Sequence, residues 1–308
     1  MQAQKTPNKL LGLILPAILC TALWGSAAPC IKLGYQLFAI DRGDTFTQLV
    51  FAGWRFTLAG LLTLLIAAFL GRRPLYPTRR NIKAILIISL FQSMIQYICY
   101  YIGLSRTTGT NGALLSGTQT FFAILFAHLL LKDDKLTPLK ALGCLVGFSG
   151  VVLLNLGGAL GQFTLLGDGL VLLSAASAGM GALVSRVYSP GHDPIILTAW
   201  QLTFGGLLLL ALGMAGGGAL RTITPSGALL MLYMVALSSV AFTVWTALLA
   251  RWPVGKVSIY GFLIPVFGAL FSALLLGERI WSPQNLGAVA LVSAGVILAN
   301  RAKAPAES

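Results

Sequence analysis

The sequence predicts an all-α, polytopic membrane protein with ten transmembrane helices arranged as two inverted five-helix repeats. Of the 308 residues, 57% are hydrophobic and only 9% are charged. The apolar residues form long runs, and the second half of the chain repeats the first. Soluble domains carry about 25% charged residues, and roughly 20 apolar residues cross a bilayer as a helix. The lipid bilayer is therefore the expected surroundings and partner of this chain.

Ten apolar runs, separated by Gly, Pro and charged residues, define the expected helices. The fifth and the tenth run are short, which is expected at the edge of a bundle or where the bilayer thins. In chain order the runs cover about 10–33, 46–70, 82–104, 109–131, 138–156, 166–188, 195–215, 226–249, 256–276 and 284–300.

The first run also has features of a signal peptide. Lys5 and Lys9 precede it, and residues 26–28 (Ser-Ala-Ala) resemble a cleavage site. The apolar run nevertheless resumes and continues to Lys32, and the internal repeat requires this segment as a helix. We therefore interpret it as the first transmembrane helix.

Positive charge predicts the orientation of the helices. The net charge is +13, but the basic residues lie between apolar runs and form no continuous patch, so no nucleic-acid partner is expected. With the N-terminus in the cytoplasm, the outer loops hold only Arg42, Arg106, Arg221 and Arg279, and Lys32 and Arg55 lie within helices. The inner segments hold Lys5, Lys9, Arg72, Arg73, Arg79, Arg80, Lys83, Lys132, Lys135, Lys140, Arg186, Arg251, Lys256, Arg301 and Lys303. The positive-inside rule thus predicts cytoplasmic termini in a plasma (inner) membrane.

The four cysteines indicate neither a disulfide framework nor a metal site. Cys20, Cys30, Cys99 and Cys144 fall inside apolar runs and show no paired spacing. We interpret them as reduced packing residues and expect no metal or cofactor.

The internal repeat is visible in two pairs of segments. "LLLKDDKLTP" (129–138) aligns with "LLLGERIWSP" (274–283), 145 residues further on. "GWRFTLAGLL" (53–62) aligns with "AWQLTFGGLL" (199–208), at an offset of 146. The two repeats cover about 10–156 and 166–300. Five helices in each repeat make the second repeat enter the membrane from the opposite side, and such halves can expose a central site alternately.

This topology places Asp133 at the cytoplasmic face and Glu278 at the outer face. Each residue ends an apolar run and precedes a helix that starts with Thr137-Pro138 or Ser282-Pro283. Helix termination is the favoured interpretation. A gate or salt-bridge role at the outer face remains the alternative for Glu278.

Three segments resemble a known family. They are "LWGSAAPCIK" (23–32), "WRF" (54–56) and "LIPVFGALFSALLLGERIWSPQNLGAVALVSAGVILAN" (263–300). The chain resembles the drug/metabolite transporter superfamily, and within it the bacterial ten-helix exporters with two tandem EamA repeats. The resemblance covers about residues 10 to 300. It implies metabolite efflux across the inner membrane, with substrates that vary widely among members.

Arg55 is the first candidate for binding a substrate. It lies about nine residues into its helix, or about 13 Å at 1.5 Å per residue, where a charge is costly and informative. Two interpretations remain open: neighbouring backbone carbonyls or helix ends hold Arg55, or it faces a cavity and binds a carboxylate or phosphate. The equivalent position holds Gln201, so the repeat itself does not require the charge.

Polar and aromatic side chains in other helices complete the expected site. In the third helix Gln92, Gln96 and Tyr100 are four apart and share one face. Hydroxyl side chains alternatively form hydrogen bonds between helices, and Trp24 and Trp200 suit either cavity walls or packing. The expected substrate-binding residues are Trp24, Arg55, Gln92, Gln96, Tyr100, Gln119, Trp200, Thr243, Trp245 and Tyr260.

No Asp or Glu lies deep within a predicted helix. His128 lies within a predicted helix, and the ordinary pKa of a histidine suits proton transfer. Two interpretations remain open: His128 relays protons, or it is a packing residue. We expect a monomeric or homodimeric secondary transporter that exports a small polar metabolite, such as an amino acid, by alternating access. A passive channel or facilitator is the alternative, although channels are usually rings of subunits. A membrane enzyme, which would need a nucleophile with a base or a metal cluster, is a weaker one.

The charge distribution makes a testable prediction about topology. A reporter that is active only outside the cytoplasm should be active when fused after Gly161 and inactive when fused after Thr78. Activity measured in whole cells, normalised to expression, checks this. The reverse pattern would exclude the ten-helix topology.

Overall fold

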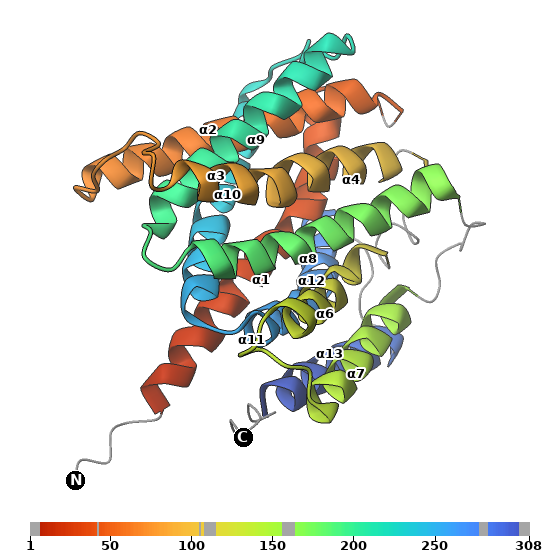
Figure 1. The fold of residues 1–308 in the computed structure, drawn as a ribbon. Coiled ribbons are helices and arrows are strands. Elements are labelled where there is room, and N and C mark those ends of the chain that lie inside the picture. The colour runs from red at the N-terminus through yellow and green to blue at the C-terminus, as the bar shows by residue number, and fades with distance from the viewer. Residues whose placement is uncertain are drawn as a thin grey trace.

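The computed structural model describes residues 7–41, 43–104, 106–107, 115–155, 164–276 and 283–301, and this part of the chain contains helices and no strands. Figure 1 shows the helices as one bundle in which the start of α1 and the end of α13 lie toward the same side. The elements are α1 (Pro7–Leu37), α2 (Thr45–Phe69), α3 (Ile82–Ser89), the π-helix η1 (Leu90–Ile95), α4 (Gln96–Leu104), α6 (Gln119–Leu130), α7 (Pro138–Asn155), the π-helix η2 (Leu165–Gly169), α8 (Leu170–Tyr188), α9 (Pro194–Ala215), α10 (Pro225–Arg251), α11 (Val254–Ser258), the 3-10 helix η3 (Ile259–Phe262), α12 (Leu263–Leu276) and α13 (Pro283–Arg301).

The helices have the length and composition of a polytopic membrane protein. Seven helices are long and apolar enough to cross a bilayer, when the continuous runs Ile82–Leu104 and Val254–Leu275 are counted as one helix each. Three further apolar helices are shorter, at Leu115–Leu130, Pro138–Leu153 and Leu286–Arg301. The predicted class is therefore confirmed, with seven helices of spanning length in the described residues where the sequence predicts ten.

Helix starts follow from local side-chain chemistry. Asp44 accepts a hydrogen bond from the Thr47 backbone N–H at 2.9 Å, and Asp193 accepts one from Ile195 at 2.8 Å. Thr224 caps α10 in the same way through the Gly227 N–H at 3.0 Å. These contacts satisfy backbone donors that have no partner inside the helix. The hydrogen bonds from Thr47, its side chain first and then its backbone, hold the pKa of the Asp44 carboxyl below its ordinary value.

The two halves of the chain interlock. Helix α2 packs along α9, and α7 packs along α13, so each of these contacts joins one half to the other. Figure 1 shows the α2–α9 pair and the α7–α13 pair at opposite edges of the bundle. Between them, α1 packs on α10 and α12, while α8 packs on α4 and α6.

Glycines allow α2 and α9 to approach closely. A Cβ on Gly60 would lie 2.6 Å from the Ala199 carbonyl oxygen, and a Cβ on Gly206 would overlap the backbone nitrogen of Thr57. Hydrocarbon gives no hydrophobic driving force between helices, so van der Waals contact at small residues has to hold them together.

The α7–α13 pair uses the same device. A Cβ on Gly150 would lie 2.7 Å from the Ala288 carbonyl oxygen, and one on Gly295 would lie 2.6 Å from the Gly143 carbonyl oxygen. Both contacts are backbone to backbone, which a larger side chain cannot relieve by changing rotamer. The two edges of the bundle therefore tolerate little increase in side-chain volume.

We expect Gly206→Val to destabilise the protein by about 1–3 kcal/mol, because overpacked helix contacts cost energy of this size. The measurement is the melting temperature of the purified protein in detergent. Gly12→Ala is the matched control, because no atom lies within 4 Å of the position that its Cβ would occupy. An unchanged melting temperature in Gly206→Val would show that the α2–α9 contact is looser than described.

Candidate functional site

A cavity of about 280 Å³ lies inside the bundle between the two halves. Its size is close to the lower end of the roughly 300–1,000 Å³ that is typical of small-molecule sites. Helices α1, α2, α4, α6, α8, α10 and α12, together with η1, α11 and η3, contribute to its lining. Seven of the residues predicted from the sequence line it: Trp24, Arg55, Gln92, Gln96, Tyr100, Gln119 and Trp245.

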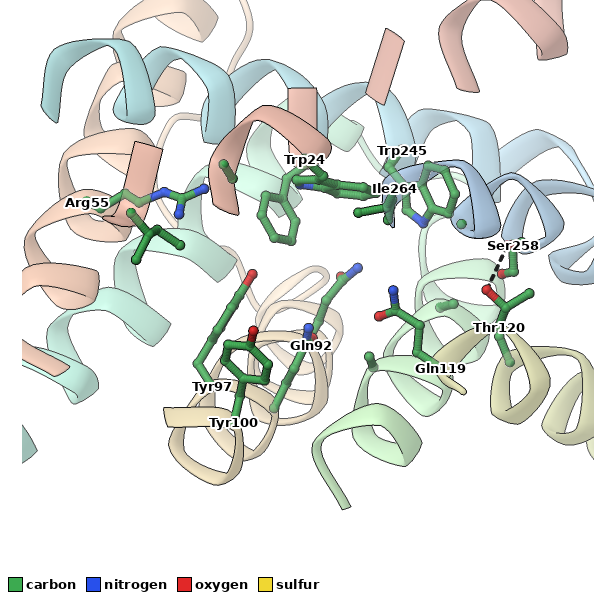
Figure 2. Close-up of a pocket in the computed structure, with 18 residues that line it drawn as sticks. Trp24, Arg55, Gln92, Tyr97, Tyr100, Gln119, Thr120, Trp245, Ser258 and Ile264 are labelled. Atoms are coloured by element: carbon green, nitrogen blue, oxygen red, sulfur yellow. Dashed lines mark hydrogen bonds between the residues drawn. The ribbon is translucent and has the colours of Figure 1, made fainter. Parts of the chain in front are cut away.

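The cavity has a polar and an apolar side. Figure 2 shows Arg55 at one end, where its guanidinium points toward the interior, and Thr120 with Ser258 at the other. The apolar wall is formed by Trp24, Trp245 and Ile264. The wall opposite carries phenol and amide groups, from Tyr97, Tyr100, Gln92 and Gln119.

Arg55 is buried, with 4% of its surface exposed. Its Nε donates a hydrogen bond to Ser238 Oγ at 2.9 Å, and Ser238 Oγ donates to the Met234 carbonyl oxygen at 2.9 Å. The guanidinium carbon lies 5.0 Å from the centre of the Phe56 ring, a cation–π distance. No described carboxylate forms an ion pair with Arg55. Ser238 therefore fixes one edge of the guanidinium and leaves its two terminal amino groups to the cavity.

A π-helical turn shapes the polar wall. Helix α3 continues through η1 into α4, so hydrogen bonds in the middle segment run between residues five apart. This spacing brings Gln92 and Tyr97 to the same side, while Gln96 and Tyr100 keep the four-residue spacing. Sequence reasoning assumed a regular helix and left Tyr97 out of the site. π-Helical turns are frequent at functional sites.

The helix formed by α11, η3 and α12 is also irregular where it lines the cavity. Helix α11 gives way to η3 and then to α12, and the Ser258 carbonyl oxygen accepts a hydrogen bond from Thr120 Oγ1 at 3.3 Å. Ser258 Oγ and Trp24 Nε1 are buried and have no hydrogen-bond partner in the described protein. The Trp24 ring stands edge-on to Phe242 and Trp245, with centroids 5.3 and 5.0 Å apart. Two polar atoms of lining residues, Trp24 Nε1 and Ser258 Oγ, can therefore form hydrogen bonds with a ligand.

Three predicted site residues do not line the cavity. Trp200 donates its indole N–H to the Leu75 carbonyl oxygen at 2.8 Å, which ties α9 to the loop after α2. Thr243 stands between the lining residues Phe242 and Trp245 but does not line the cavity, and its hydroxyl has no partner among the described residues; Tyr260 belongs to the hydrophobic core. Phe242 and Ile264 do line the cavity, but no sequence signal separates them from lipid-facing residues.

Asp133, predicted at a helix end, and His128, the possible proton relay, do not line the cavity. Asp133 forms an ion pair with Arg186, with 3.1 Å between Oδ2 and Nη2. His128 Nδ1 accepts a hydrogen bond from the Leu136 backbone N–H at 3.1 Å, which ties the ring to the loop after α6. Glu278 lies outside the described residues.

A buried ion pair that was not predicted from the sequence lies in the loop after α6, near Asp133. Asp134 and Lys140 form an ion pair although only 2% and 7% of their surfaces are exposed. Asp134 Oδ2 also accepts the Gly255 backbone N–H at 2.7 Å, and Lys140 Nζ donates to the Lys135 carbonyl oxygen at 3.1 Å. The pair thus ties the loop between α6 and α7 to the start of α11. We call Asp134, Lys140 and Gly255 the loop clasp.

A second buried acid lies at the start of the sixth predicted helix. Asp168 is fully buried in η2 and accepts hydrogen bonds from Thr107 and from the backbone and hydroxyl of Thr164. In the part of the chain that the structure describes, no three His, Cys, Asp or Glu side chains converge into a possible metal site.

Comparison with known proteins identifies the class. The sequence profile of the EamA-like transporter family matches residues 11–156 and again residues 165–301. The chain belongs to the EamA-like transporter family.

Relatives from an archaeon, a plant and a bacterium match most of this chain, and the archaeal one is named a transporter. An uncharacterized transporter of Archaeoglobus fulgidus is 28% identical over 83% of this chain and 86% of its own. A WAT1-related chloroplastic protein of Arabidopsis thaliana is 29% identical over 86% of this chain, which spans only 64% of that longer protein. An uncharacterized protein of Pseudomonas aeruginosa is 31% identical over 78% of this chain and 80% of its own.

The fold is also found in a solved structure. A crystal structure of a protein with 18% sequence identity superposes with a TM-score of 0.78, covering 93% of this chain and 97% of that one. At this level of identity the likeness concerns the fold alone.

The loop clasp generates a prediction about stability. Lys140→Met leaves the Asp134 carboxylate buried and unpaired, which we expect to lower the free energy of unfolding by about 3–5 kcal/mol. In the double variant Asp134→Leu/Lys140→Met the loss should be smaller than the sum of the single losses, because the two side chains interact directly. Melting temperatures in detergent measure both effects.

Asp133→Asn is the matched control. It removes an ion pair from a carboxylate whose side chain is 61% exposed, so the cost should stay within about 1 kcal/mol. If Lys140→Met were no more costly than Asp133→Asn, the buried pair would not hold the loop.

Proposed function

We propose that this protein is a secondary transporter that exports a small polar metabolite across the plasma (inner) membrane by alternating access. The observation that carries the proposal is the cavity itself. Amide, phenol and guanidinium groups gather in the middle of an apolar bundle, where polar side chains are costly and mark substrate pathways. Membership of a transporter family supports the same general function.

The helix contacts support two related halves, about 10–156 and 166–300. Helix α1 packs on α10 and α12, and α8, which corresponds to α1 in the second repeat, packs on α4 and α6. These partners are again corresponding helices of the two repeats. The α2–α9 and α7–α13 pairs each join a helix to its own counterpart. Such pairings are expected when a two-fold axis in the membrane plane relates the halves, as in transporters with inverted repeats.

The packing at one end of the bundle favours a carrier over an open channel. Leu13, Ile88, Leu249 and Val257 are fully buried at the end that the charge distribution assigns to the cytoplasm. The loop clasp closes the same end. Among the described residues these contacts close this side of the cavity, so release of a solute there requires the two halves to rearrange.

Counterflow in liposomes tests the proposed function. Purified protein is reconstituted, and uptake of radiolabelled benzoate, benzamide, benzylamine and phenylalanine is measured with and without the same unlabelled compound inside. A carrier predicts that internal unlabelled compound accelerates uptake of at least one probe. Protein-free liposomes give the background. Protein-dependent flux that internal compound never accelerates would indicate a channel, and no protein-dependent flux of any probe would contradict the proposal.

A further inference from the structure

We infer that the cavity selects small organic monoanions: a carboxylate binds Arg55, and an apolar body lies against Trp24 and Trp245. The inference rests on the proposed function and narrows its substrate from a polar metabolite to a net-negative one. A zwitterion such as an amino acid then becomes a poorer substrate than the acid of the same shape.

Charge balance is the first argument. Arg55 is the charged residue in the described lining, so this lining carries one positive charge and no negative one. A buried charge without a partner is strongly destabilising, and one negative charge on a ligand would balance it. The acidic residues that the structure describes lie in loops or at helix ends: Asp41, Asp44, Asp133, Asp134, Asp168 and Asp193.

The geometry of Arg55 suits a carboxylate. Its Nε is held by Ser238, which fixes the plane of the guanidinium. Its terminal amino groups have no acceptor among the described residues, and Figure 2 shows the group directed into the cavity. A fixed guanidinium presents parallel N–H groups that match the two oxygens of a carboxylate. A phosphate dianion would bring a second negative charge for which the described lining offers no cation.

Other polar groups in the lining are also hydrogen-bond donors. The Trp24 indole can only donate, and its N–H is buried without a partner. The side-chain carbonyl oxygen of Gln92 accepts a hydrogen bond from Ser185 Oγ at 3.3 Å, so the side-chain N–H groups of Gln92 remain to face the cavity. Together with the Arg55 guanidinium, these donors suit the oxygens of a carboxylate.

The apolar side determines the rest of the ligand. Phe242 lies in the second repeat where the first repeat has Gln96, and Ile264 lies where the first has Gln119. Equivalent positions therefore contribute polar groups from one half and apolar groups from the other. With Trp24 and Trp245, they form a surface for a hydrocarbon or aromatic body. An ammonium group would find no carboxylate in the described lining.

The test is a set of probes that share one ring and differ in charge. Benzoate, benzamide, benzylamine and phenylalanine are added to purified full-length protein, and binding is measured by thermal stabilisation over a concentration series. Benzoate should bind most tightly. In Arg55→Gln its affinity should fall at least ~30-fold, the equivalent of losing about 2 kcal/mol from a buried charge pair. Binding of benzamide should change little.

Matched variants separate binding from folding. Arg72→Gln removes an arginine whose side chain is 52% exposed and should leave benzoate binding unchanged. Ser238→Ala frees the Nε edge of Arg55 and should weaken benzoate less than Arg55→Gln does. If Arg55→Gln fails to fold, Arg55→Lys decides, because it keeps the charge, loses the planar fork, and should weaken benzoate while preserving the charge order of the probes.

Several results would overturn the inference. They are equal or tighter binding of benzamide, benzylamine or phenylalanine, unchanged benzoate affinity in Arg55→Gln, tighter binding of phenyl phosphate than of benzoate, or no stabilisation by any anion. The proposed function fails separately. Counterflow of a neutral or cationic probe that Arg55→Gln leaves intact would keep the carrier and remove the anion selectivity. Benzoate binding without counterflow would keep the site and remove the carrier.

Discussion

Backbone hydrogen bonding in hydrocarbon is the constraint on which the structure depends. Lipid offers no partner to an unpaired N–H or C=O, so irregular backbone is tolerated only inside protein or beside a cavity. The π-helical η1 and the 3-10 helix η3 are both irregular, and both contribute residues to the cavity. Thr120 supplies a hydrogen bond to the freed carbonyl of Ser258. The constraint that makes the chain helical therefore also limits where its site can be built.

The second constraint is the weak attraction between helices in lipid, which makes close contact at glycines decisive. Gly60 with Gly206 and Gly150 with Gly295 bring backbones together at two opposite edges of the bundle. These edges join one half of the chain to the other, and the helices that line the cavity, apart from α2 with Arg55, lie between them. A change that opens the cavity is therefore expected to keep these tight edges and to shift the helices between them, whose contacts surround the cavity.

Much of this arrangement could be predicted from sequence, because polar residues inside apolar runs have few reasons to be there. Arg55, Gln92, Gln96 and Gln119 were predicted on that basis, and all four line the cavity. Tyr97 was missed because a π-turn changes the helical spacing without a recognisable sequence pattern. Phe242 and Ile264 were missed because an apolar side chain looks the same toward lipid or toward ligand. The loop clasp depends on Gly255, more than a hundred residues from Asp134, so no local pattern reveals it.

The two buried charge sites differ in a way that bears on mechanism. Lys140 has Asp134 and a backbone carbonyl, and so its charge is balanced within the protein. Arg55 has one hydroxyl and one aromatic ring, neither of which carries a negative charge. In the proposed cycle the cavity opens to one side of the membrane, closes to both sides, and then opens to the opposite side. Closing it empty would strip water from an unbalanced guanidinium, whereas closing it around a carboxylate would enclose a neutral pair. A ligand shifts a conformational equilibrium only by its differential affinity for the states, and under the proposed cycle a bound anion stabilises the closed state relative to water in its place. The loaded carrier should therefore cross the closed state more readily than the empty one, which makes exchange of anions faster than net movement.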